Sequence, residues 1–430
     1  MRDDWEMNTE LSSALAKDLR HNLTANLLDG AFFGFAMGFA SFVTIIPLFV
    51  RTLTGSAILI GLIPAIHNVG WQLPQLFTAG WVMRQKRYKP LVMALTVHER
   101  LPYLGLALVG LALPWLGNSA ALVIIFAMLV WQGLGAGLTA NPWQSMIAKI
   151  FPSEWRGTFL GSQSAAANLL ASLAAILAGF ILQRFAGPRG FAWCFLLASL
   201  MMVVSYVFLA RTREPSHDLA PPDHSVAPPN SLANLRQIMR RDHNFRWFVI
   251  ARVVSHMALM GYAFYTVYAV DQHGVTPLGI GWITGTLLGV QIVANVVMGW
   301  IGDHWSHRPV MEIGLLAVVG SALLAWWAPG PGWFFLVFTL AAIGNVAIWT
   351  IGITMLLEFG AESERPTYIG LGNTLVAPAT ILTPFIGGWL ADAAGYPATF
   401  LASAGFGLLA VALFHFSVKD QKRRLPDLSG

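Results

Sequence analysis

The sequence predicts an all-α integral membrane protein whose twelve transmembrane helices form two pseudo-symmetric six-helix bundles. Three observations predict this class: a composition too apolar for a chain in water, a series of apolar runs of membrane-spanning length, and a repeat between the two halves. Of the 430 residues, 56% are hydrophobic and only 11% are charged. Most side chains therefore cannot face water.

The apolar runs have the length of membrane-spanning helices. A helix needs about 20 mostly apolar residues to cross the hydrocarbon core, whereas strands of an outer-membrane barrel alternate over about ten. In helices of this length the backbone groups are satisfied internally. We expect spans at residues 24–50, 57–81, 90–113, 119–148, 157–183, 190–210, 247–270, 278–301, 309–328, 332–357, 368–391 and 396–417.

The basic residues predict how the chain is oriented. With both termini in the cytoplasm, 21 of the 26 Lys and Arg residues fall in inner segments, and only Arg51, Arg184 and Arg189 fall in outer loops. This partition is the positive-inside pattern. We therefore expect a multi-pass protein of the plasma (inner) membrane with both termini cytoplasmic. The net charge of +5 has the same origin, and we expect membrane lipid rather than nucleic acid as its partner.

A Pro-rich segment divides the chain. Residues 212–244 carry five prolines among Asp, His and Ser, a composition that cannot bury a core. We predict an N-terminal bundle over 1–211, a cytoplasmic linker over 212–244 and a C-terminal bundle over 245–430. Within the linker, 231–241 has the spacing of a short helix on the inner leaflet, although a solvated basic run is an equal alternative.

The two halves repeat in sequence. Gly80-Trp81 and Pro90 follow the second span as Gly299-Trp300 and Pro309 follow the eighth, at an offset of 219 (299 − 80 and 309 − 90). The entries to these spans and the loops after spans four and ten also match. Parallel repeats of this kind place a solute path between the halves, near the midplane of the membrane.

The loop after the eighth span resembles a motif of the major facilitator superfamily. Gly299, Asp303 and Arg308 are similar to that family's cytoplasmic loop, and Gly80 begins the first-half copy, in which Arg84 stands where the acidic residue is expected. The resemblance covers essentially the whole chain. It implies alternating access, with the second-half loop latching through Glu358, Glu364 or a helix N-terminus. Simple positive-inside topology is the alternative reading of these loops.

Ionisable residues inside spans are costly and are the first candidates for function. Asp29 and Arg252 lie at similar depths in spans one and seven, where we expect them to be counterparts in the repeat, and they could bind a charged solute or a coupling ion. His256 follows Arg252 by one helical turn and could relay protons. A structural ion pair and a hydrogen-bonded core histidine are the alternatives.

Glu99 and Arg100 form the densest charged cluster, near the middle of span three. A buried glutamate suits proton coupling. A structural network with Asp29, or with His67 or Asn68 of span two, is the interpretation we favour. Neutral candidates for the pathway are Gln132 in span four, Tyr262 in span seven, and Asn345 and Trp349 in span ten, because aromatic and polar groups together suit an amphipathic solute.

Other chemistry has little support in the sequence. Cys194 is the single cysteine, so we expect neither a disulfide nor a Cys-based metal cluster. No phosphate-binding Gly-Lys loop is present, which argues against ATP as the energy source. We expect no cofactor, no metal and no catalytic residues.

These observations predict a monomeric secondary transporter of a small organic solute, with proton-coupled efflux or exchange through Asp29 or Glu99. A passive facilitator of the same fold is the main alternative, and a membrane-embedded sensor or enzyme is a weaker one.

Overall fold

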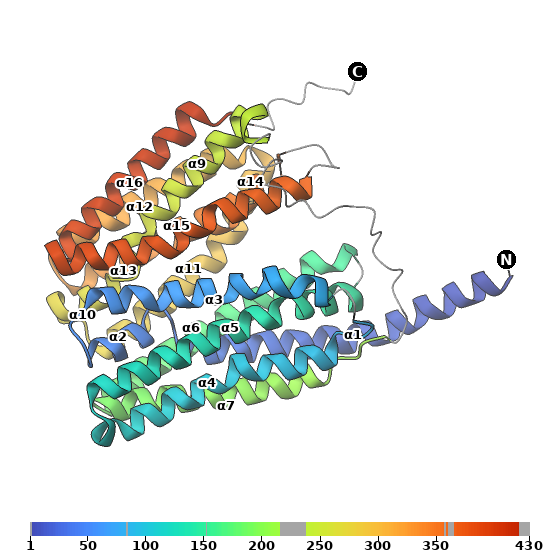
Figure 1. The fold of residues 1–430 in the computed structure, drawn as a ribbon, viewed down its shortest axis with the longest axis horizontal. Helices are drawn as coiled ribbons and strands as arrows, with labels where there is room; N and C mark the ends of the chain where they lie inside the picture. The colour runs from blue at the N-terminus through green and yellow to red at the C-terminus, as the bar shows by residue number, and fades with distance from the viewer. Residues whose placement is uncertain are drawn as a thin grey trace. The chain divides into compact units, whose positions relative to one another are not determined.

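The computed structural model describes residues 2–82, 85–151, 153–215, 238–356, 358–359 and 365–420. Only the backbone is described for 2–17, 76–77, 79–81, 153–158, 303, 365–367, 369–370 and 374. Within these ranges the ordered elements are helices and no strand occurs (Figure 1). Eleven helical stretches of the described chain are long and apolar enough to cross a membrane. The predicted all-α membrane class is confirmed.

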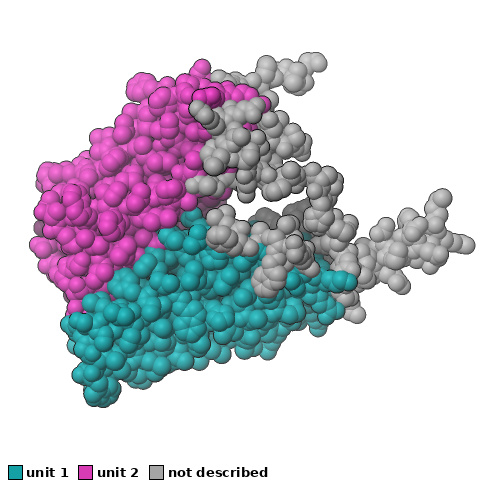
Figure 2. Space-filling model, in the orientation of Figure 1, with its two compact units in different colours: residues 1–49, 66–223 teal, residues 50–65, 224–430 magenta. Residues whose placement is uncertain are grey.

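The chain divides into two compact units, coloured in Figure 2. The first contains residues 1–49 and 66–223, and the second contains 50–65 and 224–430. The short segment 50–65 therefore packs with the second half although it belongs to the first half in sequence. The predicted boundaries at 211 and 245 stay predictions.

Small residues bring the helices of the first unit together. Its helices are α1 (Arg2–Phe39), α4 (Lys89–Leu116), α5 (Asn118–Ile150), α6 (Ser153–Arg184), α7 (Pro188–Ala210) and most of α3 (Ala57–Val82). Helix α1 packs on α6 and α7, and α4 packs on α5 and α7. A Cβ at Gly34 of α1 would overlap the backbone of Ala167 in α6. This is the close approach that small residues permit in membranes.

The second unit has a more irregular backbone. Its elements are α9 (His243–Met257), the 3-10 turn η1 (Ala258–Gly261), α10 (Tyr265–His273), α11 (Pro277–His304), α12 (His307–Trp327), η2 (Pro331–Trp333), α13 (Phe334–Val346), the π-helix η3 (Ala347–Ile351), α14 (Gly352–Leu356), α15 (Arg365–Ala394) and α16 (Tyr396–Ser417). Helix α9 packs on α15 and α16, and α12 packs on α13 and α16.

The predicted first span, 24–50, is not one helix. Helix α1 ends at Phe39 and α2 (Ile45–Arg51) begins after a break. Pro47 lies within the first turn of α2, because a proline further inside a helix would remove a backbone hydrogen bond and clash with the preceding turn. The Ser41 hydroxyl accepts hydrogen bonds from the backbone N–H groups of Val43 and Thr44, which competes with helical pairing there.

The seventh span is interrupted at a corresponding place. Helix α9 gives way to η1 and a turn before α10 begins at Tyr265, so the breaks cover residues 40–44 and 258–264. The following helices also correspond, because α3 and α11 begin 220 residues apart (277 − 57) and α4 and α12 begin 218 apart (307 − 89). The repeat seen in the sequence is thus a repeat of helix starts and of helix breaks.

Helix α3 begins on α15, inside the second unit. Asp392 of α15 accepts hydrogen bonds from the backbone N–H groups of Ala57 (2.6 Å) and Ile58 (3.1 Å). Its carboxylate lies where the positive end of the α3 dipole favours an anion. A Cβ at Gly388 would lie 2.8 Å from the Ala57 oxygen, so glycine allows this contact.

Candidate functional site

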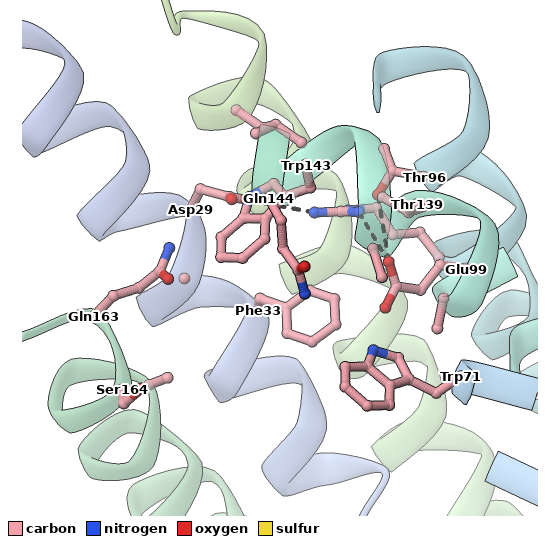
Figure 3. A pocket seen from close by; sticks show the side chains of 16 residues that line it. Asp29, Phe33, Trp71, Thr96, Glu99, Thr139, Trp143, Gln144, Gln163 and Ser164 are labelled. Atoms are coloured by element: carbon pink, nitrogen blue, oxygen red, sulfur yellow. Dashed lines mark hydrogen bonds and ion pairs between the residues drawn. The ribbon is translucent and has the colours of Figure 1, made fainter. Parts of the chain in front are cut away.

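The first unit encloses a pocket of about 280 Å³ between its helices. Helices α1, α3, α4, α5, α6 and α7 all contribute to its wall. The lining combines aromatic rings, amides and hydroxyls with three ionisable groups. Its main side chains, most of them labelled in Figure 3, are Asp29, Phe33, Trp71, Thr96, Glu99, Arg100, Thr139, Trp143, Gln144, Gln163 and Ser164.

A buried ionic network forms one side of this pocket. Arg100 Nη2 donates to Asp29 Oδ1 at 3.2 Å and to Ser205 Oγ at 3.0 Å, and Ser205 Oγ donates to the same Asp29 oxygen at 2.6 Å. Glu99 Oε2 lies 3.7 Å from Arg100 Nη1. The dashed lines in Figure 3 join both carboxylates to the guanidinium. The predicted contact between the span-three cluster and Asp29 is present.

The network holds more acid than base. Asp29 is 5% exposed and Arg100 is 8% exposed, and two carboxylates share one guanidinium. With all three ionised, one negative charge remains in a buried site, which is unfavourable. A proton on either carboxylate makes the cluster neutral. Asp29 Oδ2, unlike Oδ1, accepts no hydrogen bond from the residues that the structure describes.

Close packing places the network at the pocket. Gly135 of α5 faces the backbone of His98 and Glu99, which a Cβ would overlap, so α4 and α5 approach closely at this level. The Arg100 guanidinium also lies over the Phe33 ring, 5.3 Å from its centroid, in cation–π geometry. The side chains of α1, α4 and α7 thereby meet around a single cation.

Two further polar residues of this unit form hydrogen bonds between helices. Gln132 is outside the pocket wall, where its Oε1 pairs with His67 Nδ1 at 3.0 Å. Ser205, which bridges Arg100 and Asp29, was not predicted. A lone serine in an apolar span indicates an interhelical hydrogen bond, but the sequence does not say with which helix.

The second unit holds a second group of predicted residues. Arg252 and His256 are each 2% exposed. His256 Nδ1 lies 2.9 Å from the Arg252 carbonyl oxygen. Its ring meets the Trp349 ring edge to face, with centroids 5.0 Å apart. Three of the predicted pathway residues are therefore close together, next to the π-helix that carries Trp349.

The helix register changes one expected correspondence. At an offset of 219, Arg252 corresponds to Phe33 (252 − 33) and Asp29 corresponds to Phe248 (248 − 29). Arg252 therefore lies one helical turn beyond the position that the repeat pairs with Asp29. Arg252 packs over Phe248, 5.8 Å from its centroid, much as Arg100 packs over Phe33.

The remaining predicted pathway residues lie on α13 and beside η1. Asn345 Oδ1 accepts a hydrogen bond from Gln291 Nε2 at 3.3 Å. Thr350 of the π-helix donates to Asn295 at 2.8 Å. Tyr262 lies in the break between η1 and α10, its ring edge to face with Tyr265.

The loop motif is described only in part. Arg84 and Glu364 lie outside the described residues, and of Gly80 and Asp303 only the backbone is described. Gly299 lies in α11, where a Cβ would meet nothing within 4 Å. Arg308 pairs with Glu312 at 3.0 Å. His307 Nδ1 lies 2.6 Å from Glu358 Oε1, so the start of α12 is joined to the end of α14 through one of the predicted acids.

Solved structures share this fold. The nucleoside transporter NupG aligns over 93% of this chain and 100% of its own, with TM-score 0.71 and 12% identity. A D-xylose–proton symporter aligns over 94% and 99%, with TM-score 0.71 and 15% identity. At such low identity these likenesses show the fold alone.

Curated relatives match over shorter stretches. The inner membrane metabolite transport protein YgcS of Escherichia coli is 24% identical over 170 residues, 39% of this chain and 38% of its own length. The vesicular acetylcholine transporter of Mus musculus is 27% identical over 136 residues, 31% of this chain and 25% of its own. The chain thus matches well under half the length of these relatives.

The family model covers most of the chain. The model described as "Major Facilitator Superfamily" matches residues 99–273 and again 249–429, so both halves contribute to the match. The helical membrane fold, the repeated helix breaks and the similar solved structures agree with it. This chain belongs to the Major Facilitator Superfamily.

Proposed function

We propose that the protein is a secondary active transporter that moves a small organic solute by alternating access, with export or exchange coupled to protons. The observation that carries this proposal is the pocket of the first unit, in which two carboxylates share one guanidinium. One proton neutralises this cluster, and its release restores the charge. Such a group can take up one proton from water on one side of the membrane and release it to water on the other side in each cycle.

Glu99 is the carboxylate we assign to the proton. Asp29 has the shorter contacts, with Arg100 at 3.2 Å and Ser205 at 2.6 Å, which stabilise its ionised form. Glu99 has only the 3.7 Å contact with Arg100 and a 3.5 Å hydrogen bond from Thr96. The more weakly held carboxylate costs less to protonate. Asp29 then positions Arg100.

A contact on the segment 50–65 supports alternating access. The carboxylate of Asp392 caps the start of α3, and Arg51 pairs with Asp271 at 2.6 Å. In the predicted topology these contacts lie on the outer side. Each joins a residue of 50–65 to another part of the second unit, and we propose that they break when the outer side opens.

The coupling proposal is tested in proteoliposomes. The purified protein is reconstituted with a pH-sensitive dye inside, and uridine, D-xylose, acetylcholine and 5-aminolevulinic acid form the first panel. These solutes are chosen because they, or their chemical class, appear in the names of similar proteins. For a transported solute we expect flux to follow an imposed pH gradient. Glu99→Gln should abolish the gradient-driven part and retain solute exchange at equilibrium.

The control is Asp18→Asn, because Asp18 pairs with Arg213 and its side chain is 40% exposed. It should leave coupling intact. Flux of wild-type protein that ignores the pH gradient would exclude coupling and support the passive facilitator. Coupling that survives Glu99→Gln would remove the assigned role of Glu99.

We also propose an inner-membrane location with both termini cytoplasmic, supported by the partition of Lys and Arg. A C-terminal fusion to green fluorescent protein should fluoresce. A fusion of alkaline phosphatase after Arg189, in a predicted outer loop, should be active. A dark C-terminal fusion together with an inactive phosphatase fusion would show that the chain has the opposite orientation.

A further inference from the structure

Arg252 is a buried cation that has no acidic partner in the part of the chain that the structure describes. It is 2% exposed, and its Nε and Nη1 atoms are buried without a hydrogen-bond acceptor. No carboxylate forms an ion pair with it among the residues that the structure describes. Its neighbour on the same helix is the Phe248 ring. A lone guanidinium inside a membrane helix is strongly disfavoured, and such residues mark solute or ion pathways.

Arg100, the other buried arginine in a predicted span, has partners that compensate its charge. Arg100 is 8% exposed, and it has two carboxylates and a hydroxyl within reach. Arg252 is more buried than Arg100 and has none of these. The lack of a compensating negative charge is therefore specific to the Arg252 site. It does not follow from burial, because Arg100 is also buried and has such charges beside it.

We propose that Arg252 binds the anionic group of the transported solute, a carboxylate or a phosphate. This inference rests on the proposed function and adds a solute class to it. The guanidinium offers five N–H donors in a planar fork that matches these two oxyanions. The burial of Arg252 disfavours a lipid headgroup as the source of the anion, because a lipid-facing arginine would be exposed.

His256 adds a second requirement, a hydrogen-bond donor on the solute. A backbone carbonyl only accepts hydrogen bonds, so the 2.9 Å contact with the Arg252 oxygen places the hydrogen on Nδ1. The neutral ring then presents Nε2 as an acceptor, and this atom is buried without a partner. It lies one helical turn from Arg252. A solute that carries a hydroxyl or amino group beside its anionic group, such as a hydroxy acid, would satisfy both residues.

The site is closed in this structure, and irregular backbone lies on either side of it. The α-helical part of span seven ends one residue after His256, where η1 begins. Trp349, which covers the His256 ring, belongs to a π-helix. Such elements often occur at functional sites, and broken helices carry the solute sites of many transporters. They are the places where the backbone can move to admit a solute.

The test is thermal unfolding of the purified full chain in detergent with paired probes. The panel contains glycolate, lactate, malate, glycerol 3-phosphate and uridine monophosphate, each beside its neutral counterpart, the amide or the dephosphorylated compound. We expect at least one anion to raise the Tm of wild-type protein while its counterpart does not. In Arg252→Gln the affinity for that anion should fall about tenfold or more. Arg184→Gln, at an exposed position on α6, should bind as wild type does.

The unliganded Tm gives an independent measure. Because Arg252 lacks a partner, Arg252→Gln should raise the Tm of the empty protein, whereas Arg100→Gln should lower it. A merely structural Arg252 would give a lower Tm in both variants. No anion-specific shift in wild type, or a shift that survives Arg252→Gln, would overturn the inference. If the vesicles move a neutral solute, this inference fails while the proposed function stands; if they move no solute of any class, the proposed function fails.

Discussion

Asp29 and Arg100 illustrate how much a buried ion pair contributes to the stability of this protein. Both are almost fully buried, and Ser205 holds the carboxylate oxygen that faces the guanidinium. The desolvation of both charges offsets much of their attraction, so the intact pair adds little net stability. Removing the arginine is different, because the Asp29 and Glu99 carboxylates then remain without a cation in a site without bulk water.

We expect Arg100→Met to lower the stability of the protein by about 3 to 5 kcal/mol, because two buried carboxylates are then left without a cation. The triple variant Arg100→Met with Asp29→Asn and Glu99→Gln should recover part of this loss, since no charge is then left unpaired. Thermal unfolding in detergent measures both.

The exposed pair of Asp18 and Arg213 provides the control for this prediction. Their side chains are 40% and 58% exposed, so Asp18→Ala should cost no more than about 1 kcal/mol. A triple variant that is no more stable than Arg100→Met would show that unpaired charge is not the cause of the loss.

The sequence located the charged groups and offered Asp29, His67 or Asn68 as partners of the span-three cluster, but it did not decide among them. Asp29, Glu99, Arg100 and Arg252 are visible because a charge stands out in an apolar span. Which of them meet depends on how α1, α4 and α7 pack. Asp29 therefore meets Arg100, on another helix of the same unit, while Arg252 has no acidic partner among the residues described.

At the scale of elements, most spans could be predicted and the breaks in them could not. Length and apolarity locate a span, whereas a break depends on local backbone chemistry. Pro47 and Ser41 mark the break in span one, and the expected helix nevertheless ran through both. The π-helix at Ala347–Ile351 contains no proline and no charged residue that would reveal it.

Helix α1 offers a prediction about close packing. A Cβ at Gly34 would overlap the Ala167 backbone, which has no side-chain freedom to yield. We expect Gly34→Ala to push α1 away from α6 and to cost about 1 to 3 kcal/mol, the usual effect of overpacking. The thermal unfolding of the purified variant measures the loss.

The matched control is Gly405→Ala in α16, where a Cβ would meet nothing within 4 Å. There the better helix propensity of alanine should leave stability unchanged or raise it by up to about 1 kcal/mol. Equal behaviour of the two variants would contradict the assignment of α1 and α6 as a close-packed pair.

At the scale of the whole molecule, the sequence repeat predicted two similar halves, and the helix starts and breaks agree with it. The repeat did not predict that residues 50–65 join the compact unit of the second half. That association depends on contacts between distant parts of the chain: Asp392 with the start of α3, Arg51 with Asp271, and glycines 61 and 388 at backbone contacts. None of these pairs is marked by local sequence.

The association of residues 50–65 with the second half leads to a prediction for a divided chain. Fragments 1–223 and 224–430, expressed together, should co-purify on a tag attached to the second fragment. Asp392→Ala removes the hydrogen bonds to Ala57, Ile58 and Ser56. Losing such a cap costs about 1 to 2 kcal/mol, so recovery of the first fragment should fall by roughly five- to thirty-fold under dilute conditions. Arg51→Gln should have little effect, because its pair with Asp271 is partly exposed and is worth at most about 1 kcal/mol. Equal recovery with Asp392→Ala and Arg51→Gln would show that the cap of α3 does not hold the two fragments together.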